Sequence, residues 1–404
     1  MKINNNKRYV PYIITIGMTS VTAAVYYFLY RSSDGYFISM DMDKPVDNFI
    51  SDIINGGLSG YNNIFAFCRY NIQNVIVFLV CKLTGNIYAG VNIYYMLTFT
   101  LIAVTSLWYL QKIGVSQRMS IYLAVLLPFL PYHIDRGEGQ IITSSFFAAP
   151  LLAGILYEIY YEAKADKINK WYLAIMCAAP FVDLRLSIFA VILMILLTIH
   201  RHMANVTRVS AVYGLPMALI SLIVGKLTGI FETSDLSKSI ELAREEGMRI
   251  LDLVMPFRYH ILDRLFNYRY EYDVEFSANG ESGLNSLGIL LSIGFVIGMF
   301  LLFFGKKADK RIAWLSWINI LIILIANTSG FNILFEYFHI HIVYWNRMAI
   351  YILLNSSAVL GLAMDKLIGR LDRKRFSVLT ELALVLVLAA EFAELLLRQN
   401  MAIF

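Results

Sequence analysis

Apolar runs separated by short polar segments cover most of the chain, and a run of roughly 20 apolar residues is long enough to cross a bilayer as a helix. The pattern predicts an all-α fold: a polytopic membrane bundle of about eleven transmembrane helices, forming a single domain over residues 1–404. The expected spans are 9–30, 88–110, 119–133, 141–160, 171–182, 186–199, 209–228, 285–304, 312–328, 345–364 and 378–398.

Two long polar segments interrupt this pattern. Residues 31–87 form the first predicted loop, in which the broken apolar run 65–84 is expected to lie along the membrane as an amphipathic helix. Residues 229–284 form a second long loop, expected to be helical and rich in arginine and aromatic residues. Gly294 and Gly298 have the GxxxG spacing that suits close helix packing.

The distribution of Lys and Arg predicts the orientation. If the N-terminus is cytoplasmic and the first apolar run is an uncleaved helix, six short segments face the cytoplasm and carry 19 of the 34 Lys and Arg residues. They are 1–8, 111–118, 161–170, 200–208, 305–311 and 365–377. The loops 31–87 and 229–284 then face outward.

Composition agrees with a membrane protein. The mean hydropathy is +0.62 and only 16% of the residues are charged, a balance that a soluble domain of this length does not need. The basic segments of the predicted cytoplasmic side account for the net charge of +5, so it does not indicate a nucleic-acid partner.

Ionisable residues gather in the turns of the predicted outer face. Asp41 and Asp43 in the first loop suit a general base, a divalent-metal pair or a solvated turn. The other candidates occur in "PYHIDRGEGQ", "FVDLRLS", "MPFRYHILDR" and "YWNRMAIY", for which a charged interfacial turn, an ion pair at a helix break or an interfacial helix is the simpler alternative. These candidates are His133, Asp135, Arg136, Glu138, Asp183, Arg185, Arg258, His260, Arg264 and Arg347.

The order of these motifs resembles a known superfamily. The acidic first outer loop, the turn "PYHIDRGEG" after "LTGNIYAGVNIYYMLTFTLIAVTSLWYLQKIGVS", the Pro256–His260–Arg264 segment before "NSLGILLSIGF" and the late "WNRMAIYI" are similar to GT-C glycosyltransferases. The likeness extends over most of residues 34–364, and it includes phage-type O-antigen glucosyltransferases and YfhO-like bacterial membrane proteins. Gln140 stands where a second histidine is expected.

The resemblance implies an inverting transferase in the bacterial inner membrane, with its active site facing the periplasm. A polyprenyl-phosphate-linked hexose, such as glucose, would be the donor, and an O-antigen-type polysaccharide the acceptor. Asp41, with Asp43 as its rival, would be the base. The ten other candidates would bind the phosphate or the sugar of the donor, and a divalent cation is an open alternative.

Two other functions fit parts of the pattern. An O-antigen polymerase also joins lipid-linked sugars on the outer face and carries a long arginine-rich loop, as at 229–284. A polysaccharide flippase or transporter would need charged residues that line a path between both faces, whereas the candidate residues here concentrate on one.

Overall fold

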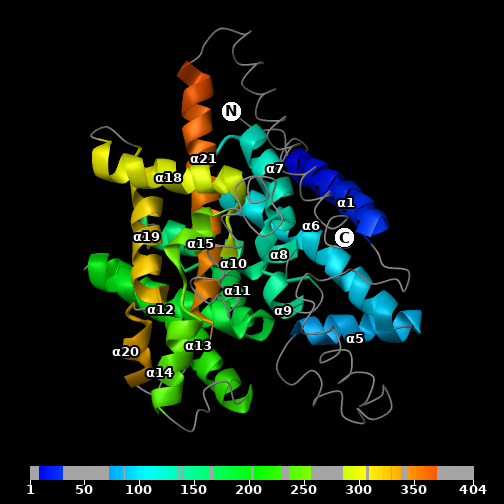
Figure 1. Ribbon diagram of the computed structural model, residues 1–404, viewed down its shortest axis with the longest axis horizontal. Coiled ribbons are helices and arrows are strands. Elements are labelled where there is room, and N and C mark those ends of the chain that lie inside the picture. The colour runs from blue at the N-terminus through cyan, green and yellow to red at the C-terminus, as the bar shows by residue number, and fades with distance from the viewer. Residues whose placement is uncertain are drawn as a thin grey trace. The chain divides into compact units, whose positions relative to one another are not determined.

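The computed structural model describes residues 9–30, 72–85, 87–134, 136–137, 141–162, 168–201, 204–228, 236–255, 285–305, 309–328, 330–337, 342 and 344–370. These ranges are helices joined by turns, without a strand and with one isolated bridge between Met248 and Asn327 (Figure 1). The prediction of an all-α fold is confirmed for this part of the chain.

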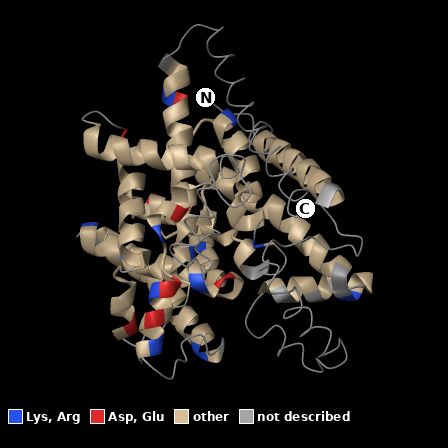
Figure 2. Cartoon of the chain, viewed as in Figure 1, with Lys and Arg blue, Asp and Glu red and all other residues tan. Residues whose placement is uncertain are grey.

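Five of the described helices are long and apolar enough to span a membrane, which is consistent with a multi-pass membrane protein. They are α1 (Val10–Tyr30), α6 (Ile87–Ile113), α12 (Leu184–Arg201), α13 (Ala204–Thr228) and α21 (Ala349–Arg370), the last preceded by the 3₁₀ turn η4 (Trp345–Met348). Figure 2 shows that charged residues are sparse along these helices. The predicted number of eleven is not confirmed.

Shorter helices lie at the other expected spans. They are α7 (Gln117–Leu126), α10 (Ala148–Tyr160), α11 (Lys170–Val182), α18 (Gly288–Phe304) and α19 (Lys310–Ala326). Short helices also lie in the segments predicted as loops, namely α5 (Ile72–Thr84), α14 (Leu236–Glu245), α15 (Ile250–Val254) and α20 (Asn332–Tyr337). The expected span 378–398 and residues 31–71 of the first loop lie outside the described residues.

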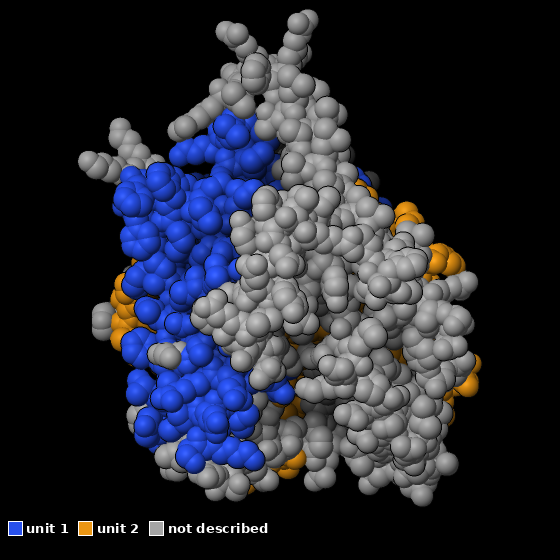
Figure 3. Space-filling model, in the orientation of Figure 1, with its two compact units in different colours: residues 1–15, 106–132, 231–404 blue, residues 16–105, 133–230 orange. Residues whose placement is uncertain are grey.

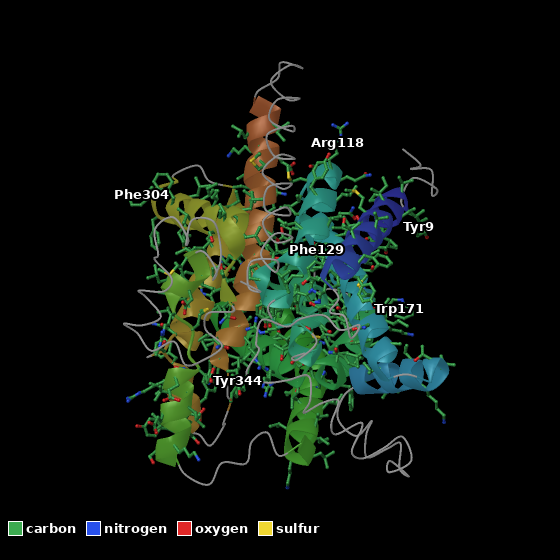
Figure 4. The ribbon with its side chains drawn as sticks, turned by 45° about the vertical axis from the view of Figure 1, so that its right-hand side comes forward. Tyr9, Arg118, Phe129, Trp171, Phe304 and Tyr344 are labelled. Atoms are coloured by element: carbon green, nitrogen blue, oxygen red, sulfur yellow. The ribbon has the colours of Figure 1, made fainter. Side chains whose placement is uncertain are left out.

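Exposed aromatic residues mark three helix ends. Tyr9, just before α1, Trp171 in the first turn of α11 and Phe304 at the end of α18 are 65%, 78% and 72% exposed (Figure 4). Each adjoins a segment predicted to be cytoplasmic. Tyr and Trp side chains favour the boundary between a bilayer and water.

The contacts divide the chain into two compact units, coloured separately in Figure 3. Unit 1 comprises residues 1–15, 106–132 and 231–404, and unit 2 comprises residues 16–105 and 133–230. Each unit is built from segments distant in the sequence.

In unit 1, α18 and α19 pack against α21 (Figure 1). Within the stretch Trp345–Gly369, which includes most of α21, 83% of the 18 most apolar consecutive residues are buried. This helix therefore forms the core of the unit. A chain of buried polar contacts joins its helices: Tyr109 donates to Asn355 Oδ1 at 2.9 Å, and Asn355 Nδ2 donates to Asn319 Oδ1 at 2.8 Å. Such bonds stabilise helix association where water is excluded.

Charged residues connect the end of α6 to the start of α19 in unit 1. Arg311 Nη1 donates to the carbonyl oxygens of Ile113 and Gly114, at 3.1 and 3.2 Å, where α6 ends. The same guanidinium pairs with Asp309 at 2.7 Å and lowers the pKa of that carboxyl, which also caps α19.

Two residues after Gly114, the backbone N–H and the hydroxyl of Ser116 donate hydrogen bonds to Asp365, at 2.6 and 2.5 Å. The contacts of Arg311 and Asp365 therefore join pieces of three segments, 111–118, 305–311 and 365–377, that the charge pattern places on one side of the membrane.

Segments predicted to lie on the opposite side also meet within unit 1. Met248 N donates to Ala326 O at 2.7 Å, and Asn332 Nδ2 donates to Ala243 O at 2.9 Å. Leu287 N donates to Leu253 O at 3.0 Å. These bonds hold α14 and α15, from the predicted long loop, against the ends of α18, α19 and α20.

Candidate functional site

His133 is the best-defined of the predicted site residues. It lies in the short helix α8 (Pro131–Ile134), which Pro131 begins, and its side chain is fully buried. The imidazole stacks on the Tyr95 ring with centroids 4.9 Å apart, and meets Phe99 edge-on at 4.4 Å. Both aromatic residues belong to α6, so unit 2 encloses the histidine in an aromatic wall.

A hydrogen bond holds one nitrogen of this imidazole. The Thr98 hydroxyl lies within hydrogen-bond distance of two partners, Tyr95 O at 2.6 Å and His133 Nε2 at 2.9 Å. The direction of the bond to Nε2 depends on the tautomer of the imidazole, and in either direction the bond anchors the ring to α6.

Replacing Thr98 by valine is expected to destabilise the protein by about 1–3 kcal/mol, because the buried Nε2 of His133 loses its hydrogen-bond partner. Thermal unfolding in detergent measures the effect. The matched control is T105V on the same helix, since among the described residues the Thr105 hydroxyl bonds only to backbone carbonyls of its own helix, at Leu101 and Ile102. Equal melting temperatures for T98V and T105V would show that the bond between Thr98 and His133 does not stabilise the protein.

A buried glutamine connects the neighbouring turn of α6 to a second predicted motif. Tyr94 donates to Gln73 Oε1 at 2.6 Å, and Gln73 Nε2 donates to the carbonyl oxygen of Val182 at 2.8 Å. Ser145, shortly after the "PYHIDRGEGQ" turn, also hydrogen-bonds Tyr94. The turn containing His133 and the helix break containing Asp183 thus approach adjacent residues of α6, within unit 2.

Asp183 has a defined local role. It occupies the break between α11 and α12 in an extended conformation, is buried, and its Oδ1 accepts from Leu186 N at 3.1 Å. This is an N-cap: the carboxylate satisfies a backbone donor at the positive end of α12. Arg185 lies half-buried in the first turn of the same helix.

Arg136 is among the largest fully buried side chains of the described residues. It follows α8 in a turn where Gly137 N donates to His133 O at 3.1 Å, and Gly137 adopts a φ of 48°, which glycine accepts at little cost. Burying a guanidinium requires compensating acceptors or anions. The turn therefore places a desolvated cation three residues from His133.

Other buried charges lie in unit 1. Arg347, on η4, is 6% exposed and its guanidinium lies 4.2 Å from the centroid of the Tyr344 ring. Asp252 and Glu336 are also buried, and Ile342 N donates to Glu336 Oε1 at 3.3 Å. Neither acid was among the candidates predicted from the sequence. Each could have been found as an isolated carboxylate within a mainly apolar segment.

The proposed catalytic carboxylates are not among the described residues. Neither are several of the other candidates, so the expected convergence of all the motifs on one pocket stays a prediction. Among the residues that the structure does describe, no three His, Cys, Asp or Glu side chains gather as a metal site. The predicted residues outside the described ranges are Asp41, Asp43, Asp135, Glu138, Arg258, His260 and Arg264.

Comparison with known proteins adds no relative. No protein-family model, curated protein or solved structure matches the chain. The functional conclusion therefore depends on the chemistry of the residues and on the order of the sequence motifs.

Proposed function

We propose that the protein is an inverting glycosyltransferase of the GT-C type. It moves a hexose from a polyprenyl-phosphate donor to an O-antigen-type polysaccharide at the outer face of a bacterial inner membrane. The finer topology belongs to the same proposal: eleven spans, a cytoplasmic N-terminus, and an active site open to the periplasm.

The observation that carries the proposal is the fully buried Arg136 beside the fully buried His133. A desolvated guanidinium in a unit of apolar helices suits a phosphate attached to a lipid, because its planar fork bonds two phosphate oxygens. The lipid tail of such a donor would lie among the same helices, which gives a reason for placing this cation in the membrane.

The reaction requires one base and several cations. Asp41, or Asp43 in its place, accepts the proton of the acceptor hydroxyl while that oxygen attacks the anomeric carbon. The bond between the anomeric carbon and the phosphate oxygen breaks, and polyprenyl phosphate leaves with the electron pair. Arg136 stabilises the charge that develops on this leaving group, as preorganised donors do in a site without water. The further cationic candidates for the phosphate are Arg185, Arg258, Arg264 and Arg347.

Replacing Arg136 by lysine is expected to lower transfer by about 10- to 100-fold, less than the 10²–10³-fold cost of deleting a preorganised donor, because lysine keeps the charge but loses the fork. The measurement is release of polyprenyl phosphate from a polyprenyl-phosphate hexose by purified protein with the acceptor polysaccharide. The matched control is R118K, since Arg118 lies exposed on the first turn of α7 (Figure 4). Wild-type release by R136K would remove Arg136 from the site.

A deletion strain separates the proposal from its alternatives. If the protein is a transferase of this kind, its deletion leaves the polysaccharide at its normal length but with one hexose fewer in each repeating unit. Shortened chains would instead indicate a polymerase, and lipid-linked intermediates retained on the cytoplasmic side would indicate a flippase. Mass analysis of the surface polysaccharide distinguishes these outcomes.

A further inference from the structure

Asn346 in unit 1 combines full burial with an unsatisfied side chain. It is the second residue of η4, and its backbone N–H donates to Glu246 O at 3.0 Å, which ties the turn to the end of α14. The side chain is 0% exposed. Within the described part of the chain, neither Nδ2 nor Oδ1 of this carboxamide has a hydrogen-bond partner.

The arrangement differs from the buried asparagines nearby. Asn332 donates to Ala243 O at 2.9 Å and accepts from Ile333 N at 3.0 Å. Asn355 accepts from the Tyr109 hydroxyl and donates to Asn319 Oδ1. Buried polar groups are normally paired in this way, and an unpaired one needs an explanation. Asn346 therefore indicates a ligand rather than a packing role.

The backbone around Asn346 supports this interpretation. Tyr344, two residues earlier, has a φ of 68° and is the sole described residue other than glycine with a positive φ; it lies near one end of α21 (Figure 4). Such strain concentrates at ligand sites. The turn also holds Arg347 at 6% exposure, and the ring of Trp345 lies tilted against that of Phe335 with centroids 5.2 Å apart. A cation and aromatic rings thus adjoin the carboxamide in sequence.

The chemistry of the carboxamide selects the ligand. Nδ2 must donate and Oδ1 must accept, so the ligand must do both. An ionised phosphate only accepts and a metal cation only takes lone pairs, and each would leave one atom of Asn346 unsatisfied. Hydroxyl groups meet both demands, and neighbouring sugar hydroxyls meet them together.

We propose that Asn346 binds hydroxyl groups of a saccharide, with Arg347 beside it as a second donor. This inference deepens the proposed function, because the choice of a saccharide over another polyhydroxyl compound rests on it. It assigns sugar recognition to Asn346, a residue that the sequence interpretation did not single out, beside Arg347, which that interpretation connected with the phosphate or the sugar of the donor.

Unfolding experiments separate a ligand role from a structural one. Leucine resembles asparagine in shape, so N346L removes an unsatisfied polar group, and we expect its melting temperature to equal or exceed that of the wild type. The matched variant N332L leaves Ala243 O and Ile333 N without their partner, and we expect its melting temperature to fall. A fall for N346L comparable with that for N332L would overturn the proposal, because it would show that water or protein satisfies the amide.

Binding is tested with free sugars. Methyl glycosides of glucose, galactose and mannose are titrated into purified protein while the melting temperature and tryptophan fluorescence are followed, with inorganic phosphate as the comparison. We expect at least one glycoside to stabilise the wild type and N346L to bind it at least tenfold more weakly. No response of the wild type to any glycoside, or an unchanged response of N346L, would overturn the proposal.

These outcomes are distinguishable from failure of the proposed function. Free glycosides test sugar recognition without a lipid donor and without transfer. A protein that binds them through Asn346 but never releases polyprenyl phosphate would keep this inference and lose the transferase mechanism.

Discussion

Replacing Asp41 by asparagine is expected to lower sugar transfer by about 10²–10⁴-fold, the contribution typical of a positioned general base. Asparagine has nearly the same shape but cannot accept the proton of the attacking hydroxyl. The protein should therefore insert and accumulate as the wild type does. Transfer is measured as gain of the hexose on the surface polysaccharide in a deletion strain that carries the variant.

Neighbouring carboxylates in the first loop provide the controls. D43N distinguishes the two candidate bases, since only the variant of the true base should lose transfer at normal protein levels. D47N lies in the same acidic loop and should retain activity. Full activity in D41N would exclude Asp41 from the mechanism, and loss in D47N as well would point to the charge of the whole loop.

Apolar periodicity was sufficient to predict the helices but not how many of them span a membrane. Runs such as 209–228 correspond closely to α13, because twenty apolar residues have few other stable conformations in lipid. The stretch 119–133 instead contains α7, the 3₁₀ turn Leu127–Phe129 and the start of α8, with Pro128 and Pro131 at the breaks. Composition alone does not separate a broken helix from a spanning one.

The candidate site shows a sharper limit. Ionisable residues such as His133, Arg136 and Arg347 are visible in the sequence because they interrupt apolar segments, and the structure buries all three. Gln73 and Asn346 are neutral and common, so nothing in the sequence marks them. Gln73 matters because of its hydrogen bonds to Tyr94 and Val182, and Asn346 because its buried side chain has none within the described residues. A single sequence does not reveal such tertiary contacts.

The GxxxG pair predicts close helix packing without naming a partner, and the structure places Gly294 of α18 against α21. This contact leads to the second large effect. In the structure, a Cβ added to Gly294 would fall on the carbonyl oxygen of Ser356 and 3.0 Å from Leu360 Cβ. Backbone atoms cannot rotate away, so α18 must move from the central helix of unit 1. We expect G294A to destabilise the protein by about 1–3 kcal/mol, the range for overpacking a core, although alanine favours helix by about 1 kcal/mol.

Two other helical glycines grade the effect. A Cβ at Gly298 would approach the Ser316 hydroxyl at 2.6 Å, a group that can rotate, so G298A should cost less than G294A. A Cβ at Gly17 on α1 would meet no atom within 4 Å, so G17A should be neutral or slightly stabilising. Melting temperatures in one detergent should therefore rank G17A above G298A and G298A above G294A. Equal melting temperatures for G294A and G17A would show that α18 and α21 do not approach as closely as the structure places them at Gly294. A clash with a backbone carbonyl oxygen cannot be relieved by rotating a side chain.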